Sequence, residues 1–143
     1  MDKRNTKECE MIVLQAMEAI QEEDEETFSR LLYPVQKKEW QKETGEPALP
    51  TARQLRDALS EIEPYGFILP YEIENICEAE DYYGRNWYEE SQIPVTAVID
   101  ASVYWSATEK KTLCSAWPVT FQCLNIDGIW YLNPYWAWEY LKA

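Results

Sequence analysis

Apolar residues in the first part of the chain recur with the period of an α-helix. We expect a helix over residues 6–22, because one apolar stripe runs through it at intervals of three and four residues. The residues of this stripe are Cys9, Val13, Ala16, Met17 and Ile20. Met11, Ile12 and Leu14 widen the stripe, so the sequence predicts that other parts of the chain cover most of this helix.

A second, shorter helix is predicted over residues 24–33. Asp24 is a suitable N-cap, since its carboxylate can accept a hydrogen bond from an amide of the first turn. Pro34 pushes the preceding residue out of helical geometry and therefore ends the helix. The residues expected to face inward are Phe28, Leu31 and Leu32.

A third helix is predicted over residues 51–62, after a loop at 35–50. Thr51 and Gln54 match the capping box, in which each side chain bonds the backbone amide of the other residue. The apolar positions of this helix again follow the helical period, and they are Leu55, Ala58, Leu59 and Ile62.

From residue 67 onward the apolar period changes to two, which is typical of β-strands. Along 93–106, odd-numbered residues form one apolar face, even-numbered residues including Asp100 form a polar face, and Val98 alone is out of pattern. Asp127-Gly128 between apolar flanks predicts a tight hairpin. The predicted strands are about 67–77, 93–106, 112–126 and 129–134, with a long connection at 79–92.

The order of these elements predicts an α+β fold in a single domain over residues 1–143. Two strands of about 14 residues seldom stay flat, because twist and bulges bend a sheet of that length. We therefore expect the N-terminal helices to pack on the inner face of a strongly curved antiparallel sheet. The aromatic C-terminal tail, "NPYWAWEYLKA", is expected to pack along its rim.

Two stretches carry a resemblance to a known superfamily. "AIQEEDEETFSRLLYP" (19–34) resembles a helix, acidic turn and helix, and "PVTAVIDASVYW" with "VTFQCLNIDGIWYL" resembles the terminal strands, of the cystatin-like, NTF2-like (SnoaL-like) superfamily. The chain is similar to small bacterial single-domain members. The resemblance implies a cone-shaped roll with a pocket between helices and sheet, and a homodimer formed through the outer sheet face. Members include enzymes, ligand binders and immunity proteins, so the fold alone does not choose a function.

The charge balance separates classes of partner. The chain has 26 acidic and 13 basic residues, a net charge of −13, and no histidine. Phosphate backbones and anionic membrane surfaces repel such a protein, so neither nucleic acid nor membrane is an expected partner. A basic protein would be attracted to it. The alternative, that acidity only maintains solubility, stays open at this point.

Composition also bears on the compartment. No apolar run approaches the roughly 20 residues of a membrane span, and no apolar segment of a signal peptide follows the start. The four cysteines, Cys9, Cys77, Cys114 and Cys123, show no C-x-x-C spacing. They are expected to be reduced in a cytoplasmic protein, although an exported form with a removed leader remains an alternative.

Little in the sequence points to catalysis. No histidine, paired cysteine, calcium loop or glycine-rich phosphate loop is present, so neither a metal nor a cofactor is predicted. The weak catalytic candidates are Asp100 and Tyr104, which would face the interior only if a bulge shifted their strand. In the unshifted register, Asp100 is expected to be solvated.

The aromatic residues support two kinds of binding. Loop aromatics framed by carboxylates are suited to a basic partner; the predicted partner-binding residues are Tyr82, Tyr83, Trp87, Tyr88, Glu89 and Glu90. The alternative is that this loop packs onto its own domain. Strand residues are expected to form the core or to line an apolar pocket, and they are Tyr71, Ile99, Val103, Trp105, Trp117, Phe121 and Trp130.

Three functions therefore stay open. The first is a non-catalytic, acidic protein-binding domain, of the immunity or inhibitor type, that binds a basic protein partner. The second is a binder of a small apolar or aromatic ligand in the cone, and the third is a small isomerase- or dehydratase-like enzyme.

Overall fold

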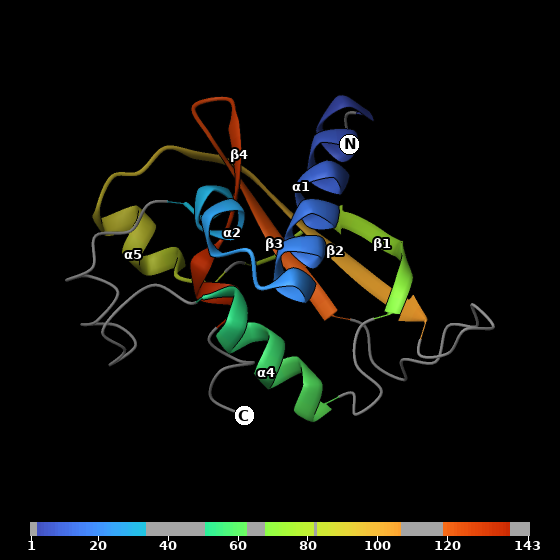
Figure 1. Ribbon diagram of the computed structural model, residues 1–143. Coiled ribbons are helices and arrows are strands. Elements are labelled where there is room, and N and C mark those ends of the chain that lie inside the picture. The colour runs from blue at the N-terminus through green and yellow to red at the C-terminus, as the bar shows by residue number, and fades with distance from the viewer. Residues whose placement is uncertain (1–2, 34–50, 63–67, 82, 107–118, 138–143) are drawn as a thin grey trace.

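The structure, a computed structural model, describes residues 3–33, 51–62, 68–81, 83–106 and 119–137 (Figure 1). The described chain has the predicted α+β class, with helices first and an antiparallel sheet after them. The helices are α1 (Lys3–Glu22), α2 (Glu25–Leu31), α4 (Ala52–Ile62) and α5 (Arg85–Glu90), followed at the end by the 3-10 helix η1 (Pro134–Ala137). The strands are β1 (Ile68–Glu78), β2 (Val95–Ser106), β3 (Val119–Ile126) and β4 (Ile129–Leu132).

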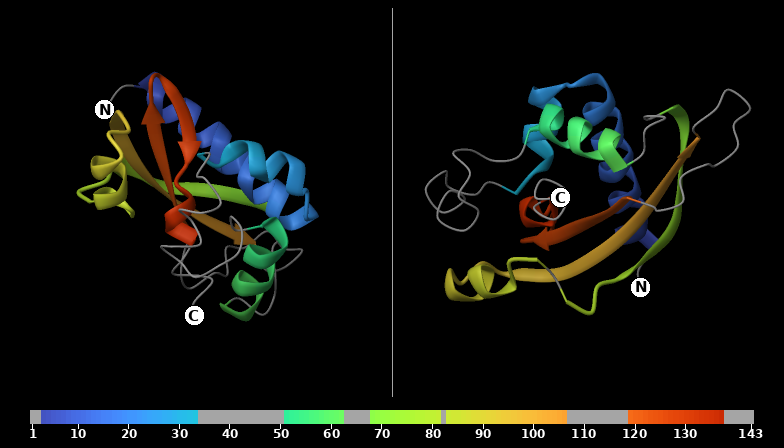
Figure 2. Two further views of the ribbon diagram at one scale, coloured as in Figure 1. Left: turned by 90° about the vertical axis from the view of Figure 1, so that its left-hand side faces the viewer. Right: turned by 90° about the horizontal axis from the view of Figure 1, so that it is seen from below.

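The described strands form a simple meander in the order β1-β2-β3-β4, in which each pairs antiparallel with the next. The predicted hairpin is confirmed: Asp127 and Gly128 have φ values of 53° and 83°, the left-handed geometry of a tight turn. Seen from below, β1 and β2 bend around α1 (Figure 2). The first seven residues predicted for the third strand, 112–118, lie outside the described residues.

Helix α1 lies across the inner face of the sheet and contacts β1, β2 and β4 as well as α2 and α4. Its predicted stripe is confirmed, since Cys9, Val13, Ala16, Met17 and Ile20 are all fully buried. The prediction that Met11 and Leu14 are covered is wrong: their exposed fractions are 54% and 41%. The helices that follow leave this flank of α1 open, so the apolar stripe is wider than the surface that covers it.

Helix α2 begins where the sequence places its cap. The Asp24 carboxylate accepts a hydrogen bond from the Thr27 amide at 3.2 Å and another from the Thr27 hydroxyl at 2.7 Å. Phe28 and Leu32 are buried as predicted, and Leu31 is half-buried. The helix ends at Leu31 because Leu32 turns to extended geometry and forms a bridge to Leu132.

The capping box of α4 is also confirmed. The Thr51 amide donates to the Gln54 side chain at 2.9 Å, and the Gln54 amide donates to the Thr51 hydroxyl at 3.0 Å. The Glu25 carboxylate accepts from the Ala52 amide at 2.6 Å, which fastens the start of α4 to α2.

Within the described ranges, no helix is long and apolar enough to cross a membrane.

The main core lies between α1 and the inner face of the sheet. Ile99, Ala101 and Val103 of β2 are buried against the α1 stripe, as the odd-numbered pattern predicts. Phe121 of β3 packs on Trp136 of η1, with ring centroids 4.6 Å apart. The expected packing of the C-terminal aromatic tail is therefore confirmed as far as Trp136, which is buried.

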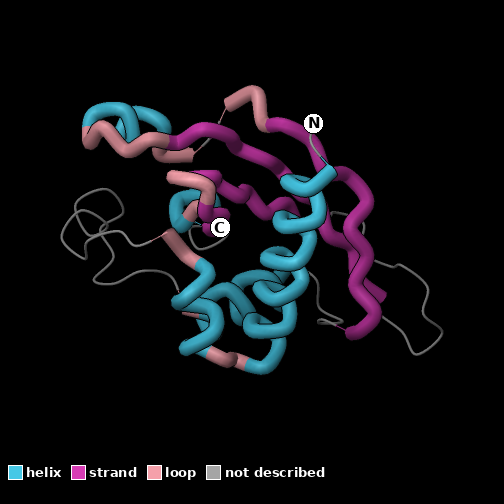
Figure 3. Tube along the Cα trace, turned by 90° about the horizontal axis from the view of Figure 1, so that it is seen from above, coloured by secondary structure: helices cyan, strands magenta, loops and turns pink. Residues whose placement is uncertain are grey.

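A second core covers one end of the outer face of the sheet, where α5 lies apart from the other three helices (Figure 3). Val98 and Leu124, which are paired across β2 and β3, belong to this core. Val95 belongs to it as well, although the odd-numbered pattern assigned it to the inner face. The register shifts between Val95 and Ala97, and this irregularity moves the start of β2 onto the other face.

Candidate functional site

The predicted partner-binding aromatics are divided between the second core and the surface. Tyr88 is fully buried, and its hydroxyl donates to the Asn133 side chain at 3.0 Å. Trp87 is half-buried and packs edge-on against Tyr88, with centroids 5.0 Å apart. The interpretation of Tyr88 as a partner contact thus does not agree with its burial; together with Trp87, it holds α5 on its own domain.

The remaining members of that predicted surface lie elsewhere. Tyr83 keeps an exposed fraction of 39%, and Glu89 and Glu90 are exposed on α5. Tyr82 lies outside the described residues. The role of Tyr83, Glu89 and Glu90 in binding a partner stays a prediction.

The buried side-chain amide of Asn133 links the residues just before α5 to the end of the sheet through hydrogen bonds. Its Nδ2 donates to the Tyr83 carbonyl at 2.8 Å and to Gln122 Oε1 at 2.9 Å. Its Oδ1 accepts from the Tyr88 hydroxyl and, at 2.9 Å, from the Tyr135 amide. Asn133 therefore has a partner for each polar group of its side chain, as a fully buried amide requires.

The same network reaches Asp100 through Gln122, which is buried between the connection and the sheet. Gln122 Oε1 accepts from the Tyr83 amide at 2.9 Å, and its Nε2 donates to Asp100 Oδ1 at 2.8 Å. Asp100 and Gln122 are directly opposed on β2 and β3. The connection before α5, through Tyr83, thus covers part of the outer face beside the second core, where the polar residues Asp100 and Gln122 lie.

Asp100 stands at the wall of a small hollow in this face. The hollow has a volume of about 260 Å³ and is lined by Asp81, Tyr83, Asp100, Thr120 and Gln122. Asp100 lies on the outer face as predicted, but it is half-buried, so its carboxylate is only partly solvated. Burial raises the pKa of Asp100, while the hydrogen bond from Gln122 opposes that shift.

Of the two weak catalytic candidates, Asp100 is not brought into the interior. Asp100 occupies the outer face, opposite the buried odd-numbered residues of β2, so no bulge turns it toward the main core. The backbone of Tyr104 pairs with Glu72, and its side chain lies outside the described part of the structure. Catalysis by this pair stays an untested prediction.

The predicted pocket-lining residues that the structure describes lie in the main core. Ile99, Val103 and Phe121 are fully buried there, and Trp130 is almost so. Tyr71 and Trp105 are paired in the backbone of β1 and β2, but their side chains and all of Trp117 are outside the described residues. Among described residues, no group of three or more His, Cys, Asp or Glu side chains is placed to hold a metal ion.

A second hollow lies on the opposite side of the molecule, between α1 and the β3–β4 hairpin. Its volume is about 310 Å³, and it is mostly apolar. Ile129, at the tip of the hairpin, is 55% exposed and faces this hollow beside the equally exposed Met11. The complete lining is Glu8, Met11, Ile12, Gln15, Gly128, Ile129 and Trp130.

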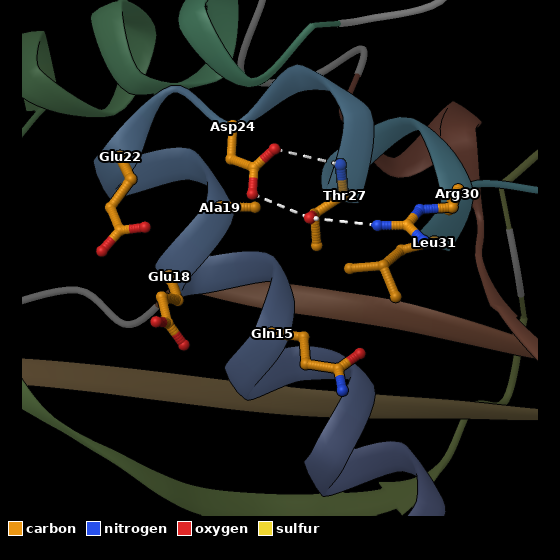
Figure 4. A pocket seen from close by; sticks show the side chains of 8 residues that line it. All are labelled: Gln15, Glu18, Ala19, Glu22, Asp24, Thr27, Arg30 and Leu31. Carbon is orange, nitrogen blue, oxygen red and sulfur yellow. Dashed lines mark hydrogen bonds between the residues drawn. The ribbon is translucent and has the colours of Figure 1, made fainter.

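A third hollow continues along α1 toward α2 (Figure 4). Its volume is about 470 Å³, and Glu18 and Glu22 of α1 stand on one wall while Thr27, Arg30 and Leu31 of α2 form the other. Asp24 closes the end, and hydrogen bonds from Thr27 lower the pKa of its carboxyl. Three carboxylates against one guanidinium give this hollow a net negative charge.

These two hollows follow each other along α1, and we call them together the α1 groove. They share Gln15, and the α1 residues that line them are 8, 11, 12, 15, 18, 19 and 22. Intervals of three and four residues place all seven on one face of the helix. The groove is therefore apolar at the hairpin end and acidic at the α2 end.

The sequence pattern indicates few of the residues that make these surfaces. The helical period predicts that Met11 is covered, and the Asp127-Gly128 turn predicts Ile129 only as part of a closing strand. The polar positions Thr120 and Gln122 gave a usable signal, because both alternate with the apolar residues Phe121 and Cys123 and so must share the face of Asp100.

Comparisons of this chain with protein-family models, with curated proteins and with solved structures find no match.

Proposed function

We propose that this protein is a non-catalytic binding domain whose α1 groove holds a basic segment of another protein. The observation that carries the proposal is the exposure of Met11 and Ile129, which come from different elements and face one hollow. Apolar side chains gathered on an otherwise highly charged surface are typical of an interaction site. Each is only about half exposed, so covering the remainder of each would contribute roughly 0.8–1.6 kcal/mol to binding.

Charge selects the kind of partner. The net charge of −13 attracts a basic protein over long distances and accelerates its encounter. Near contact, Glu18 and Glu22 are exposed on the α1 wall of the groove, where a lysine or arginine can reach them. The opposite wall carries the positive Arg30, which donates to the Thr27 hydroxyl at 3.5 Å. A cation is therefore favoured at the α1 wall, where Glu18 and Glu22 lie.

The length of the groove limits the partner segment. From residue 8 to residue 22 an α-helix rises about 21 Å, at roughly 1.5 Å per residue. A partner helix of about 14 residues, or an extended segment of about six, spans that distance. Its apolar residues would lie at the hairpin end and its lysines or arginines at the α2 end.

The biological setting that fits this chemistry is neutralisation of a basic protein, as by an immunity- or inhibitor-type protein in the cytoplasm. An evolutionary relation to the NTF2-like superfamily, with its cone-shaped roll and its homodimers through the outer sheet face, belongs to the same proposal. It is supported by the order of helices before an antiparallel meander and by the bend of β1 and β2 around α1 (Figure 2). A homodimer would have to use the outer face beyond the part that α5 covers.

The two alternative functions have less support. A small apolar ligand in the cone would need space among Ile99, Val103 and Phe121, and these side chains are packed in the main core. An enzyme of the isomerase or dehydratase type would need an acid or base facing that space, whereas Asp100 lies on the other face of the sheet.

Selection from a displayed library of random peptides tests the proposal. We expect the selected peptides to combine an apolar cluster with at least two lysines or arginines. Their affinity should fall as salt is added, because exposed charges are screened. Peptides without an excess of basic residues, or with affinities that salt does not change, would contradict the proposal.

Variants assign the binding to the groove. Met11→Ser with Ile129→Ser should weaken the selected peptides at least tenfold without loss of folding, because both side chains are exposed. Glu18→Gln with Glu22→Gln should weaken them and reduce the salt dependence. Asp57→Asn with Glu78→Gln removes the same charge at exposed positions that line none of the hollows, and it is the matched control, for which we expect a much smaller effect.

A further inference from the structure

We infer that the hollow around Asp100 is a second binding site, which holds a single organic cation: a guanidinium or ammonium group on an alkyl stem. It lies on the outer face of the sheet, whereas the α1 groove lies beside the helix that covers the inner face. The inference rests on the proposed function only for the source of the cation, which would be an arginine or lysine side chain of the basic partner.

The charge at the site is the Asp100 carboxylate. Within the described structure it receives one hydrogen bond, from Gln122 to Oδ1. Gln122 cannot turn away to leave Asp100, because its Oε1 is held by the Tyr83 amide and by Asn133. The carboxylate is thus fixed in position and half-desolvated, while its second oxygen keeps the capacity to accept a charge-assisted hydrogen bond.

The walls of the hollow suit a cation with an apolar stem. Tyr83 is one of the lining residues and is 39% exposed, and a tyrosine ring attracts a guanidinium or ammonium group within its reach. Thr120 lines the other side, where its hydroxyl lies 3.1 Å from that of Ser102. A volume of about 260 Å³ exceeds the share of one liquid water, about 30 Å³, several times over, so the hollow has room for such a group.

Of the two carboxylates that line the hollow, Asp100 is the one that no ion pair in the described structure offsets. Asp81 also lines the hollow, and its carboxylate pairs with Arg85 Nε at 3.1 Å. Arg85 donates to the Glu80 carbonyl as well, at 3.4 Å, and is not part of the lining. The other titratable groups near Asp100 in the described part of the chain are Tyr83 in the lining, Cys77, opposite it on β1, and the buried Cys123 on β3. A positive group in the hollow would therefore meet the Asp100 charge directly.

NMR titration with small molecules tests this site without the partner. The probes are N-acetyl-arginine amide, its neutral isostere N-acetyl-citrulline amide, and cadaverine as a free alkylammonium. We expect the arginine derivative to shift the side-chain amide signals of Gln122 and the backbone amide of Tyr83, and the citrulline derivative to leave them unchanged. Affinity should rise with pH as Asp100 ionises.

Two variants separate the site from other effects. Asp100→Asn keeps the acceptor for Gln122 but removes the charge, and it should weaken the arginine derivative at least tenfold. Tyr83→Ala, which leaves the backbone bonds in place, should weaken it less. Equal shifts from the citrulline derivative, or undiminished binding to Asp100→Asn, would overturn the inference.

Further measurements identify the source of the cation and show whether the two sites are independent. Stronger binding of the arginine derivative than of cadaverine favours a protein side chain as the ligand, and the reverse order favours a free amine and contradicts that source. Met11→Ser with Ile129→Ser should leave these shifts unchanged. If the shifts survive while the groove binds no basic peptide, the proposed function fails and the site around Asp100 stands.

Discussion

Gln122 donates a hydrogen bond of 2.8 Å to Asp100 from the directly opposed position on the neighbouring strand. The amide is buried and the carboxylate is half-buried, because the connection before α5 folds over both. A carboxylate that would be solvated on a bare sheet face is thereby kept in place at the edge of a hollow. Its position has consequences for stability as well as for binding.

Asp100→Asn should stabilise the protein at neutral pH. Burial raises the pKa of Asp100 above 3.8, so folding favours the protonated carboxyl. That contribution is present below the unfolded pKa and is lost as pH rises through the folded pKa, so at pH 7 the ionised carboxylate costs stability. Because the group is partly exposed and screened by solvent, we expect a gain of at most about 1 kcal/mol.

Urea unfolding at pH 7 and at pH 3.5 measures this effect. The difference between Asp100→Asn and the parent protein should shrink at the lower pH, which lies below the unfolded pKa of 3.8, so that most of the Asp100 carboxyl is protonated in both states. Asp57→Asn, at an exposed position on α4, removes the same charge and controls for the general repulsion in an acidic protein. A gain no larger than that of the control, or one that persists at pH 3.5, would contradict the account of Asp100.

Asn133→Ala should destabilise the protein strongly. The change removes two donated and two accepted hydrogen bonds and leaves buried partners such as Tyr88 unsatisfied. We expect a loss of about 3–5 kcal/mol in the free energy of unfolding. Asn125→Ala, which removes bonds from the exposed Thr96 hydroxyl and Gly128 amide, should cost about 1 kcal/mol and is the control. Similar costs for the two variants would show that the Asn133 network is not important for stability.

Gly84→Ala should cost more than Gly128→Ala, although both glycines have positive φ values, 76° and 83°. A Cβ at position 84 would lie 2.8 Å from Cδ2 of Tyr135, whereas nothing lies within 4 Å of one at position 128. Left-handed geometry costs each alanine about 1 kcal/mol, and the contact with the buried Tyr135 ring adds roughly 1–3 kcal/mol. Thermal or urea unfolding gives both values, and equal costs would mean that α5 does not pack against Tyr135 as described.

The cysteines should differ widely in reactivity toward a thiol reagent at pH 8. Cys77 is exposed, while Cys9 and Cys123 are buried in the main core. The hydrogen bond with Cys9, together with burial, raises the pKa of the Cys123 thiol well above its usual range. In a Cys114→Ser background, one thiol should react promptly and two at least about 100-fold more slowly, because their reaction awaits local opening. Prompt reaction of all three thiols would contradict the packing of α1 on β3.

The sequence predicted best where one residue pattern determines one local structure. The α1 stripe, the cap at Asp24, the capping box of Thr51 and Gln54, and the Asp127-Gly128 hairpin were all correct, because each depends only on near neighbours. Helix α5 was missed, since it has six residues and its N-cap is Gly84, which offers no side-chain hydrogen bond. A helix that short has no apolar period to detect.

The residues of the candidate sites were harder to predict, because exposure depends on what other elements cover. The period of α1 could not show that Met11 remains open, and the period of β2 could not show that the connection covers Asp100. The register shift between Val95 and Ala97 likewise places Val95 on the outer face, while the residues on either side of the shift keep their alternation. Val98, out of pattern in the sequence, was the visible sign that the outer face carries a core of its own.

Methyl NMR with the tightest peptide from the library selection tests the central claim most directly. Met11 and Met17 lie on the same helix, one exposed and one fully buried, and Ile129 and Ile99 form a similar pair. We predict that a basic peptide shifts the methyl signals of Met11 and Ile129 while those of Met17 and Ile99 change little. Shifts confined to other surfaces, such as that around Trp87, with Met11 and Ile129 unaffected, would show that the α1 groove is not the binding site.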